Sequence, residues 1–245
     1  MALTSTTDVQ SRCPHCGKEL TPITAKLMDS EFVVAYAPCD CPGATAEREE
    51  RQSREEELER AELAERRRKA YIRAGVKPRF LDAESPRAAG ILADVKRGIG
   101  AYICGPVGTG KTHLASAVAR LTVDGGLSVK MTDMLGILAA LKATYGGDGT
   151  EDDVLHRLTR CGLLIVDDLG KEAPTEWTLG QVFRVINARY EALKPVIVTT
   201  QFSKADLARR LSRHGDRETA EAIVSRLSEM CTKVEMTGAD RRLRK

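Results

Sequence analysis

Two zones of the chain differ in how apolar and polar positions alternate. From residue 79 onward, short apolar runs are separated by longer stretches in which apolar residues recur at helical spacing. An apolar run of this length predicts a strand that is buried on both faces. The predicted strands are residues 99–104, 127–131, 163–166, 196–200 and 232–236.

The stretches between these strands predict helices. Thr132 is the expected N-cap of the first of two helices that lie between the second and third strands, and the glycine-rich segment 146–149 separates the two. The predicted helices are residues 112–123, 132–145, 150–160, 175–193, 203–211 and 218–230. Alternation of this kind predicts an α/β fold, with a parallel sheet covered by helices on both faces.

The first zone has a different character. Residues 32–37 predict a short strand, and residues 45–74 form a charged stretch without Gly or Pro that predicts an exposed helix with i,i+4 ion pairs. Gly75 and Pro78 end that helix. We therefore expect an N-terminal domain over 1–45, a charged helical linker over 46–78 and the α/β domain over 79–245.

Composition narrows the class of protein. The chain has 245 residues and a net charge of +3, which is too small to indicate nucleic-acid binding by itself. No apolar stretch approaches the length of a membrane span and the N-terminus is polar, so we expect a cytoplasmic protein without membrane partners. The seven cysteines are then not expected to form disulfides.

One octapeptide carries the strongest chemical signal. Residues 105–112 read Gly-Pro-Val-Gly-Thr-Gly-Lys-Thr, after a predicted strand and before a predicted helix, which is the context of a phosphate-binding loop. Lys111 is expected to reach the β- and γ-phosphates of ATP, and the Thr112 hydroxyl to ligate Mg²⁺. The nucleotide-binding residues are predicted to be Gly105, Pro106, Val107, Gly108, Thr109, Gly110, Lys111, Thr112 and His113.

Two carboxylates supply a second nucleotide signature. Asp167 and Asp168 directly follow the apolar strand 163–166, so they are expected at the carboxyl edge of the sheet, where open α/β folds bind ligands. Asp167 is predicted to hold Mg²⁺, and Asp168 to polarise the attacking water.

These motifs together resemble the AAA+ ATPases of the initiator and helicase-loader group. The resemblance rests on Gly-Thr-Gly-Lys-Thr-His-Leu-Ala at 108–115, Asp-Asp-Leu-Gly at 167–170 and Thr-Thr-Gln at 199–201. It covers residues 79–245 and is strongest to DnaC/DnaI-type helicase loaders and IstB-type transposition ATPases. It implies a three-layer AAA+ fold with a five-stranded parallel sheet and no C-terminal lid.

The resemblance also implies further site residues. Gln201 is similar to sensor 1, Arg226 to an arginine finger that reaches a neighbouring subunit, and Arg242 to sensor 2, with Arg241 as the alternative. The extra helix between the second and third strands is similar to the element that contacts single-stranded DNA in the family. Lys130 and Lys142 are therefore candidate phosphate contacts.

Four of the cysteines predict a metal site. Cys13 and Cys16 form a C-x₂-C knuckle, and Cys39 and Cys41 add a C-x-C pair, so four thiolates are available for one structural Zn²⁺. His15 is an alternative ligand for one of them. Cys104, Cys161 and Cys231 lie in or beside apolar runs and are predicted to be buried.

The sequence thus favours an ATP-dependent loader that places the replicative hexameric helicase on single-stranded DNA and self-associates through its AAA+ domain. An IstB-like ATPase that assists a transposase is the main alternative. Asp168 stands where AAA+ enzymes more often have Glu, so a nucleotide-gated binding module with negligible turnover is a further alternative. A small-metabolite kinase is disfavoured, because no separate substrate domain is evident.

Overall fold

The computed structural model describes residues 11–27, 30–147, 149–214 and 216–240. The chain divides into two compact units, residues 1–65 and 66–245, and the charged helix α1 (Pro42–Ala74) crosses the boundary between them. Arg241 and Arg242 lie outside the described residues. Within the described part of the chain, every helix is too short or too polar to cross a membrane.

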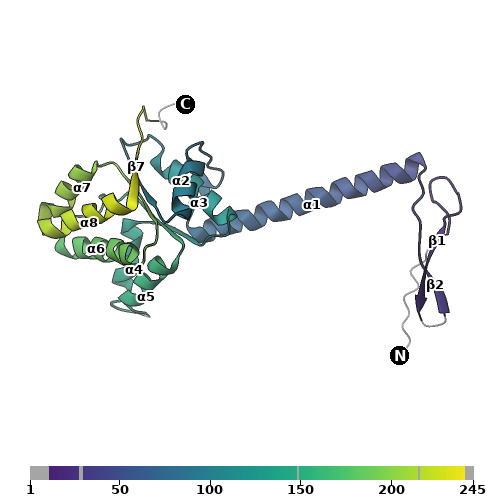
Figure 1. The fold of residues 1–245 in the computed structure, drawn as a ribbon, viewed down its shortest axis with the longest axis horizontal. Helices are drawn as coiled ribbons and strands as arrows, with labels where there is room; N and C mark the ends of the chain where they lie inside the picture. The colour runs from purple at the N-terminus through teal and green to yellow at the C-terminus, as the bar shows by residue number, and fades with distance from the viewer. Residues whose placement is uncertain (1–10, 28–29, 148, 215, 241–245) are drawn as a thin grey trace. The chain divides into compact units, whose positions relative to one another are not determined.

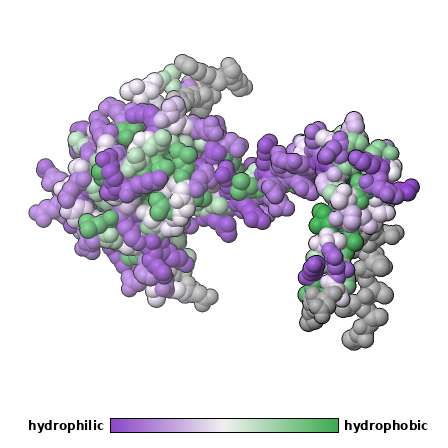
Figure 2. Space-filling model, turned by 45° about the vertical axis from the view of Figure 1, so that its right-hand side comes forward, coloured by the Kyte–Doolittle hydropathy of each residue, from purple (hydrophilic) through white to green (hydrophobic). Residues whose placement is uncertain are grey.

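The N-terminal unit is a small antiparallel hairpin followed by the first part of α1. Strand β1 (Pro22–Leu27) pairs with β2 (Ser30–Tyr36), and β1 is an element that the sequence pattern did not predict. Leu27 and Phe32 are 70% and 53% exposed, and apolar side chains reach the surface of this unit in Figure 2. Of the described apolar residues in this unit, only Cys13 and Ala44 are buried. An apolar core therefore cannot hold this unit together.

The second unit is built on a five-stranded parallel sheet, as predicted, with strand order β4-β5-β6-β3-β7. Figure 1 shows helices on both sides of it. Its strands are β3 (Gly100–Cys104), β4 (Val129–Asp133), β5 (Leu163–Asp167), β6 (Val196–Thr200) and β7 (Cys231–Glu235). The three central strands β5, β6 and β3 are buried at every position, which explains their continuous apolar runs.

Seven α-helices lie wholly within the described part of this unit. They are α2 (Ala88–Lys96), α3 (Lys111–Asp124), α4 (Met134–Ala143), α5 (Glu151–Arg160), α6 (Glu176–Glu191), α7 (Lys204–Leu211) and α8 (Arg217–Met230). Short 3₁₀ turns occur at Pro78–Phe80 and Ser212–His214. Of the helices, α2 was not predicted. No helix follows β7 among the described residues.

The two faces of the sheet have separate apolar cores. On β3, Tyr102 and Cys104 pack with helices α4 to α8, whereas Ala101 and Ile103 pack with α2, α3 and the end of α1. This division follows from the alternation of side chains along a strand.

Several helices of this unit begin at a residue whose side chain caps the first turn. Thr150 caps α5 in a reciprocal capping box with Asp153, and Thr175 caps α6. At α4 the prediction of Thr132 was wrong, because the carboxylate of Asp133 accepts the N–H of Gly136 at 2.8 Å. Strand β4 continues to Asp133, so Thr132 is still extended backbone.

A buried arginine joins the amino-terminal ends of two strands. Arg189 on α6 is fully buried, and its guanidinium donates only to neutral partners among the described residues, mainly backbone carbonyls. The carbonyl acceptors belong to Leu158, Thr159, Cys161, Gly162 and Pro195. The last turn of α5 and the segments before β5 and β6 are thereby held at the edge of the sheet opposite the predicted nucleotide site.

Candidate nucleotide site and cysteine cluster

The phosphate-loop sequence connects β3 to α3, as predicted, and the loop conformation depends on glycine. Gly108 and Gly110 have φ values of 80° and 94°, in the left-handed region that favours glycine. Gly110 is the N-cap residue of α3 and provides no side-chain cap. The N-terminal N–H groups of α3 therefore face the loop, and an anion is the ligand that such a helix end attracts.

Lys111 is the first residue of α3, and its side chain reaches back to the start of the loop. Its side chain is buried, and its ammonium donates to the carbonyl oxygens of Gly105 at 2.8 Å and Pro106 at 2.7 Å. The Thr109 hydroxyl also donates to Pro106, at 2.9 Å. The loop thus holds a positive charge close to its backbone N–H groups.

The acidic pair lies beside this loop at the carboxyl edge of the sheet. The Thr112 hydroxyl donates to Asp167 Oδ1 at 2.9 Å, so the two residues predicted to hold Mg²⁺ are in contact. Burial raises the pKa of the Asp167 carboxyl; the Thr199 hydroxyl bond opposes this shift, and the charge of Asp168 adds to it. The ammonium of Lys77 lies 3.9 Å from Asp167 Oδ2.

Asp168 has an unusual backbone conformation. Its φ is 58°, in the left-handed region that few residues other than glycine adopt. Asp enters this region more readily than longer side chains do, because its carboxylate is short. The conformation offers a physical reason for Asp at a position where Glu is more usual. The Asp168 carboxylate pairs with Lys171 at 2.7 Å.

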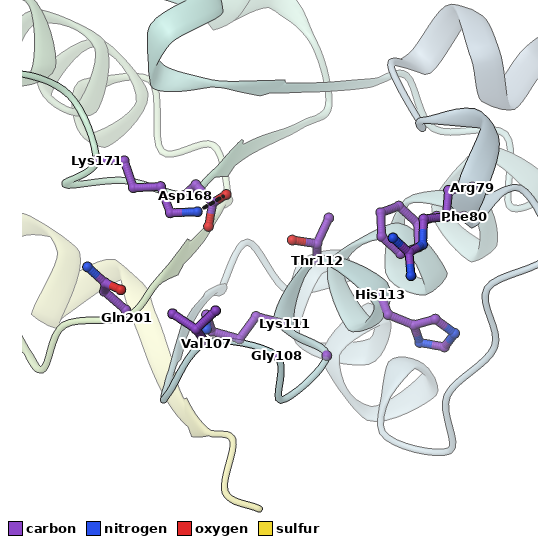
Figure 3. A pocket seen from close by; sticks show the side chains of 11 residues that line it. Arg79, Phe80, Val107, Gly108, Lys111, Thr112, His113, Asp168, Lys171 and Gln201 are labelled. Carbon is purple, nitrogen blue, oxygen red and sulfur yellow. Dashed lines mark hydrogen bonds and ion pairs between the residues drawn. The ribbon is translucent and has the colours of Figure 1, made fainter. Parts of the chain in front are cut away.

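A pocket of about 360 Å³ lies between the phosphate loop and Asp168. Figure 3 shows Lys111 and Thr112 on one side, with Asp168, Lys171 and Gln201 from the neighbouring strand ends on the other. Its lining residues are Arg79, Phe80, Val107, Gly108, Gly110, Lys111, Thr112, His113, Asp168, Lys171 and Gln201. The pocket therefore combines an anion-binding helix end with a carboxylate and an amide.

The pocket also contains residues that the sequence pattern did not reveal. Arg79 and Phe80 follow α1, and the Phe80 ring meets the His113 ring edge to face with centroids 6.3 Å apart. Lys171 is the third such pocket residue. None of these residues belongs to a motif of fixed spacing, so no motif identified them as pocket residues. The position of Lys171 three residues after Asp168 is the one local indication.

The C-terminal segment also reaches the phosphate loop. A Cβ added to Gly108 would lie 1.9 Å from the carboxyl carbon of Asp240. The residue before the two predicted sensor 2 arginines is therefore adjacent to the loop.

Arg226 is not among the residues that line the pocket. It lies on α8, where its Nε donates to Asn187 Oδ1 at 2.8 Å. Its guanidinium is 4.9 Å from the Phe183 ring centroid and 5.4 Å from that of Tyr190. The structure thus separates Arg226 from the residues that it brings together around Lys111.

The four N-terminal cysteines converge within their own unit. The sulfur atoms of Cys13, Cys16, Cys39 and Cys41 all lie within 4.8 Å of one another. The Cys13–Cys41 and Cys16–Cys39 sulfur distances are 3.7 and 3.5 Å. Four thiolates around one Zn²⁺ have sulfur atoms about 3.8 Å apart, because the Zn–S bond is about 2.3 Å and the geometry tetrahedral. The cluster therefore has the dimensions of a zinc site.

His15 lies beside the cysteine cluster but points to another partner. Its Nε2 is 2.8 Å from Glu47 Oε2, on α1. The cluster of candidate ligands that lie close together contains the four thiols and not this imidazole. The alternative in which His15 replaces a cysteine is thus not supported by the geometry.

Comparison with known proteins places the second unit in a recognised group. Residues 90–245 match the family described as IstB-like ATP binding protein. The chain is 30% identical over 164 residues to the insertion sequence IS21 putative ATP-binding protein of Pseudomonas aeruginosa, covering 67% of this chain and 60% of that one. It is 27% identical over 108 residues to the replicative helicase loader DnaC of Escherichia coli (strain K12), covering 44% of each. The chain thus spans less than two thirds of the length of these relatives.

Solved structures give the same picture. The crystal structure of the DnaC helicase loader superposes with a TM-score of 0.55 and 26% identity, covering 66% of this chain and all of that one. The crystal structure of DnaI gives a TM-score of 0.52 and 26% identity, covering 63% and 80%. A DnaA initiator bound to AMPPCP and single-stranded DNA, at 22% identity and a TM-score of 0.53, shares the fold. The α/β domain of this chain thus has an AAA+ fold.

Proposed function

The chain belongs to the family of IstB-like ATP-binding proteins. We propose that it is an AAA+ ATPase that loads the replicative helicase onto single-stranded DNA. ATP binding drives assembly through the AAA+ domain, and hydrolysis drives release. The observation that carries the loader role is the separate N-terminal unit with its cysteine cluster, which would serve as a partner-binding module distinct from the ATPase domain.

The nucleotide site supports the proposal through the groups it gathers. Lys111 and the α3 N-terminus would bind the phosphates, and Thr112 and Asp167 would hold a Mg²⁺ ion. Bound Mg²⁺ neutralises charge on the phosphates. Asp168 would polarise the attacking water, and Gln201, directly after β6, would present its amide to the γ-phosphate. Lys171 must then release the Asp168 carboxylate before hydrolysis.

Single-stranded DNA is the proposed second ligand of the ATPase domain. Lys130 lies exposed on β4, and Lys142 lies on α4 with its ammonium 5.0 Å from the Trp177 ring centroid. Proteins that bind single strands use aromatic rings to stack on bases and nearby cations to pair with phosphates. This pair supports the DNA contact that the family resemblance suggests.

The rival proposal is an ATPase that assists a transposase. It is favoured by the match to the insertion-sequence protein, which covers more of this chain than the match to DnaC does. Both proposals use the same nucleotide site, so only the partner distinguishes them.

Partner binding tests the proposal directly. The purified chain of 245 residues with an ATP analogue is expected to form a complex with the replicative helicase of the same cell, measured by size-exclusion chromatography with light scattering. The transposase encoded nearest the gene serves as the competing partner. A stable complex with the transposase, together with none with the helicase, would reverse the assignment.

The cysteine cluster carries a separate prediction. One Zn²⁺ is expected to copurify with each chain, and Cys16→Ser with Cys39→Ser is expected to lose it, because two thiolates remain. The N-terminal unit should then unfold, since its described residues bury almost no apolar side chains, while ATP affinity stays within about threefold. Metal analysis by mass spectrometry and calorimetry measure the two effects.

Cys161→Ser is the matched control for the zinc prediction. Cys161 is half-buried in the ATPase domain, where its thiol donates to the Leu158 carbonyl, so its loss should leave the metal content at one per chain. Wild-type protein that is free of zinc after anaerobic, chelator-free purification contradicts the assignment of the cluster.

A further inference from the structure

Thr199 connects the two acids of the nucleotide site. It is the fourth residue of β6, next to β5, and it is fully buried. Its hydroxyl lies 2.6 Å from Asp167 Oδ1 and 2.9 Å from the backbone nitrogen of Asp168. One hydroxyl thus touches both residues on which metal binding and water activation depend in the proposed function.

The direction of these two hydrogen bonds is determined by chemistry. The Asp168 backbone N–H can only donate, so the Thr199 oxygen accepts there. A hydroxyl has one proton, and the Asp167 carboxylate can only accept when ionised, so that proton goes to Asp167. A valine at 199 would have the same shape but would remove both bonds.

The bond to Asp168 supports a strained backbone. At φ 58°, Asp168 is in a conformation that costs a non-glycine residue free energy and persists only where its surroundings impose it. The backbone of Thr199 adds a second constraint, because the Leu169 N–H donates to the Thr199 carbonyl at 2.9 Å. Residue 199 therefore holds the backbone on both sides of the Asp168 side chain, which lines the pocket in Figure 3.

The bond to Asp167 orients the other carboxylate. Asp167 Oδ1 accepts from the Thr112 hydroxyl as well as from Thr199, which limits rotation of the carboxylate. Thr112 is itself a predicted metal ligand, so its hydroxyl has a competing role when Mg²⁺ binds. Thr199 has no such role, because its side chain is fully buried and does not line the pocket.

We infer that Thr199 is a positioning residue of this ATPase: its hydroxyl orients Asp167 toward Mg²⁺ and fixes the backbone that aims Asp168 at the attacking water. The inference rests on the proposed ATP hydrolysis and not on the choice of partner. Removing a hydrogen bond that orients a metal-ligating carboxylate typically lowers metal affinity or activity by about 10- to 100-fold.

The test compares neighbouring threonines in protein without helicase, transposase or DNA. Thr199→Val is expected to raise the Mg²⁺ concentration for half-maximal binding of an ATP analogue about tenfold and to lower kcat about 100-fold, with a smaller change in KM. Thr199→Ser keeps the hydroxyl and should restore both values to within about threefold of wild type. Calorimetry at a series of Mg²⁺ concentrations gives the first readout.

Thr200→Val is the matched control. Thr200 is equally buried on the same strand, and its hydroxyl donates to the Leu169 carbonyl at 2.7 Å without touching either acid. Its loss should lower the melting temperature about as much as Thr199→Val does, while the Mg²⁺ dependence stays at the wild-type value. If Thr199→Val is insoluble, Thr199→Cys, with a weaker donor of similar volume, should shift both readouts in the same direction.

Three outcomes overturn the inference. One is an equal shift of Mg²⁺ dependence in the Thr199→Val and Thr200→Val variants, and another is a Thr199→Ser variant that fails to recover. The third is wild-type protein that binds the ATP analogue without any dependence on Mg²⁺, which would also remove the metal from the proposed function. Failure to bind the helicase changes none of these readouts.

Discussion

Lys111→Ala is expected to lower the affinity for ATP by at least about 100-fold, because the variant lacks the point charge that meets the β- and γ-phosphates. In the structure the Lys111 ammonium is buried against the Gly105 and Pro106 carbonyls. It is therefore already placed inside the loop and loses little side-chain freedom when a phosphate binds. Isothermal calorimetry with an ATP analogue measures the loss.

Lys171→Ala provides the comparison for this prediction. Lys171 lines the same pocket but is half-exposed and pairs with Asp168 rather than with the loop. Its removal changes the net charge of the pocket by the same amount, so affinity should fall by no more than about fivefold. Equal losses in the two variants, or unchanged affinity in a Lys111→Ala protein that melts like wild type, would refute a phosphate-binding role for Lys111.

Arg226→Ala is expected to leave ATP binding unchanged and to slow hydrolysis by about 10³, because an arginine finger stabilises charge in the transition state of a neighbouring subunit. Arg226 does not line the pocket of its own chain, so we expect a direct contact with nucleotide to be made in trans. Turnover per wild-type chain should accordingly rise with protein concentration, and single-stranded DNA should increase it further by aligning subunits.

Mixing two inactive variants tests action in trans. Arg226→Ala has an intact nucleotide site and Lys111→Ala has an intact Arg226, so a mixture should recover part of the activity. Asn187→Ala is the structural control, because it removes the bond to Arg226 Nε and keeps the guanidinium. It should retain most of the turnover. Absence of recovery in mixtures that demonstrably co-assemble would assign Arg226 to the packing of α6 against α8.

The nucleotide site could be predicted from sequence to the extent that its chemistry is local. The octapeptide at 105–112 has fixed spacing because consecutive backbone N–H groups must surround one phosphate. The position of Asp167 follows from an apolar run that ends at the carboxyl edge of a sheet. Element types were predicted well for the same reason, since periodicity is a property of neighbouring residues.

Predictions were less complete where the pattern is weak or the deciding contact is distant. Strand β1 is exposed at every position and carries no period of burial, so its sequence gave little indication of a strand. The N-cap of α4 moved from Thr132 to Asp133 because pairing of β4 with β5 extends the strand by two residues. Helix α2 is short, and the glycine within it weakens the helical pattern.

The sequence by itself determined the α/β class, the phosphate loop, the acid pair and the four candidate metal ligands. Only the tertiary structure decided that Thr199 bonds both acids, that Arg79 and Phe80 border the pocket, that His15 pairs with Glu47, and that Arg226 packs on Phe183. These contacts join residues about thirty or more positions apart in the sequence, and Phe183 meets Arg226 across two packed helices. Such pairs have no common period or spacing along the chain, because the register of strands and the packing of helices bring them together.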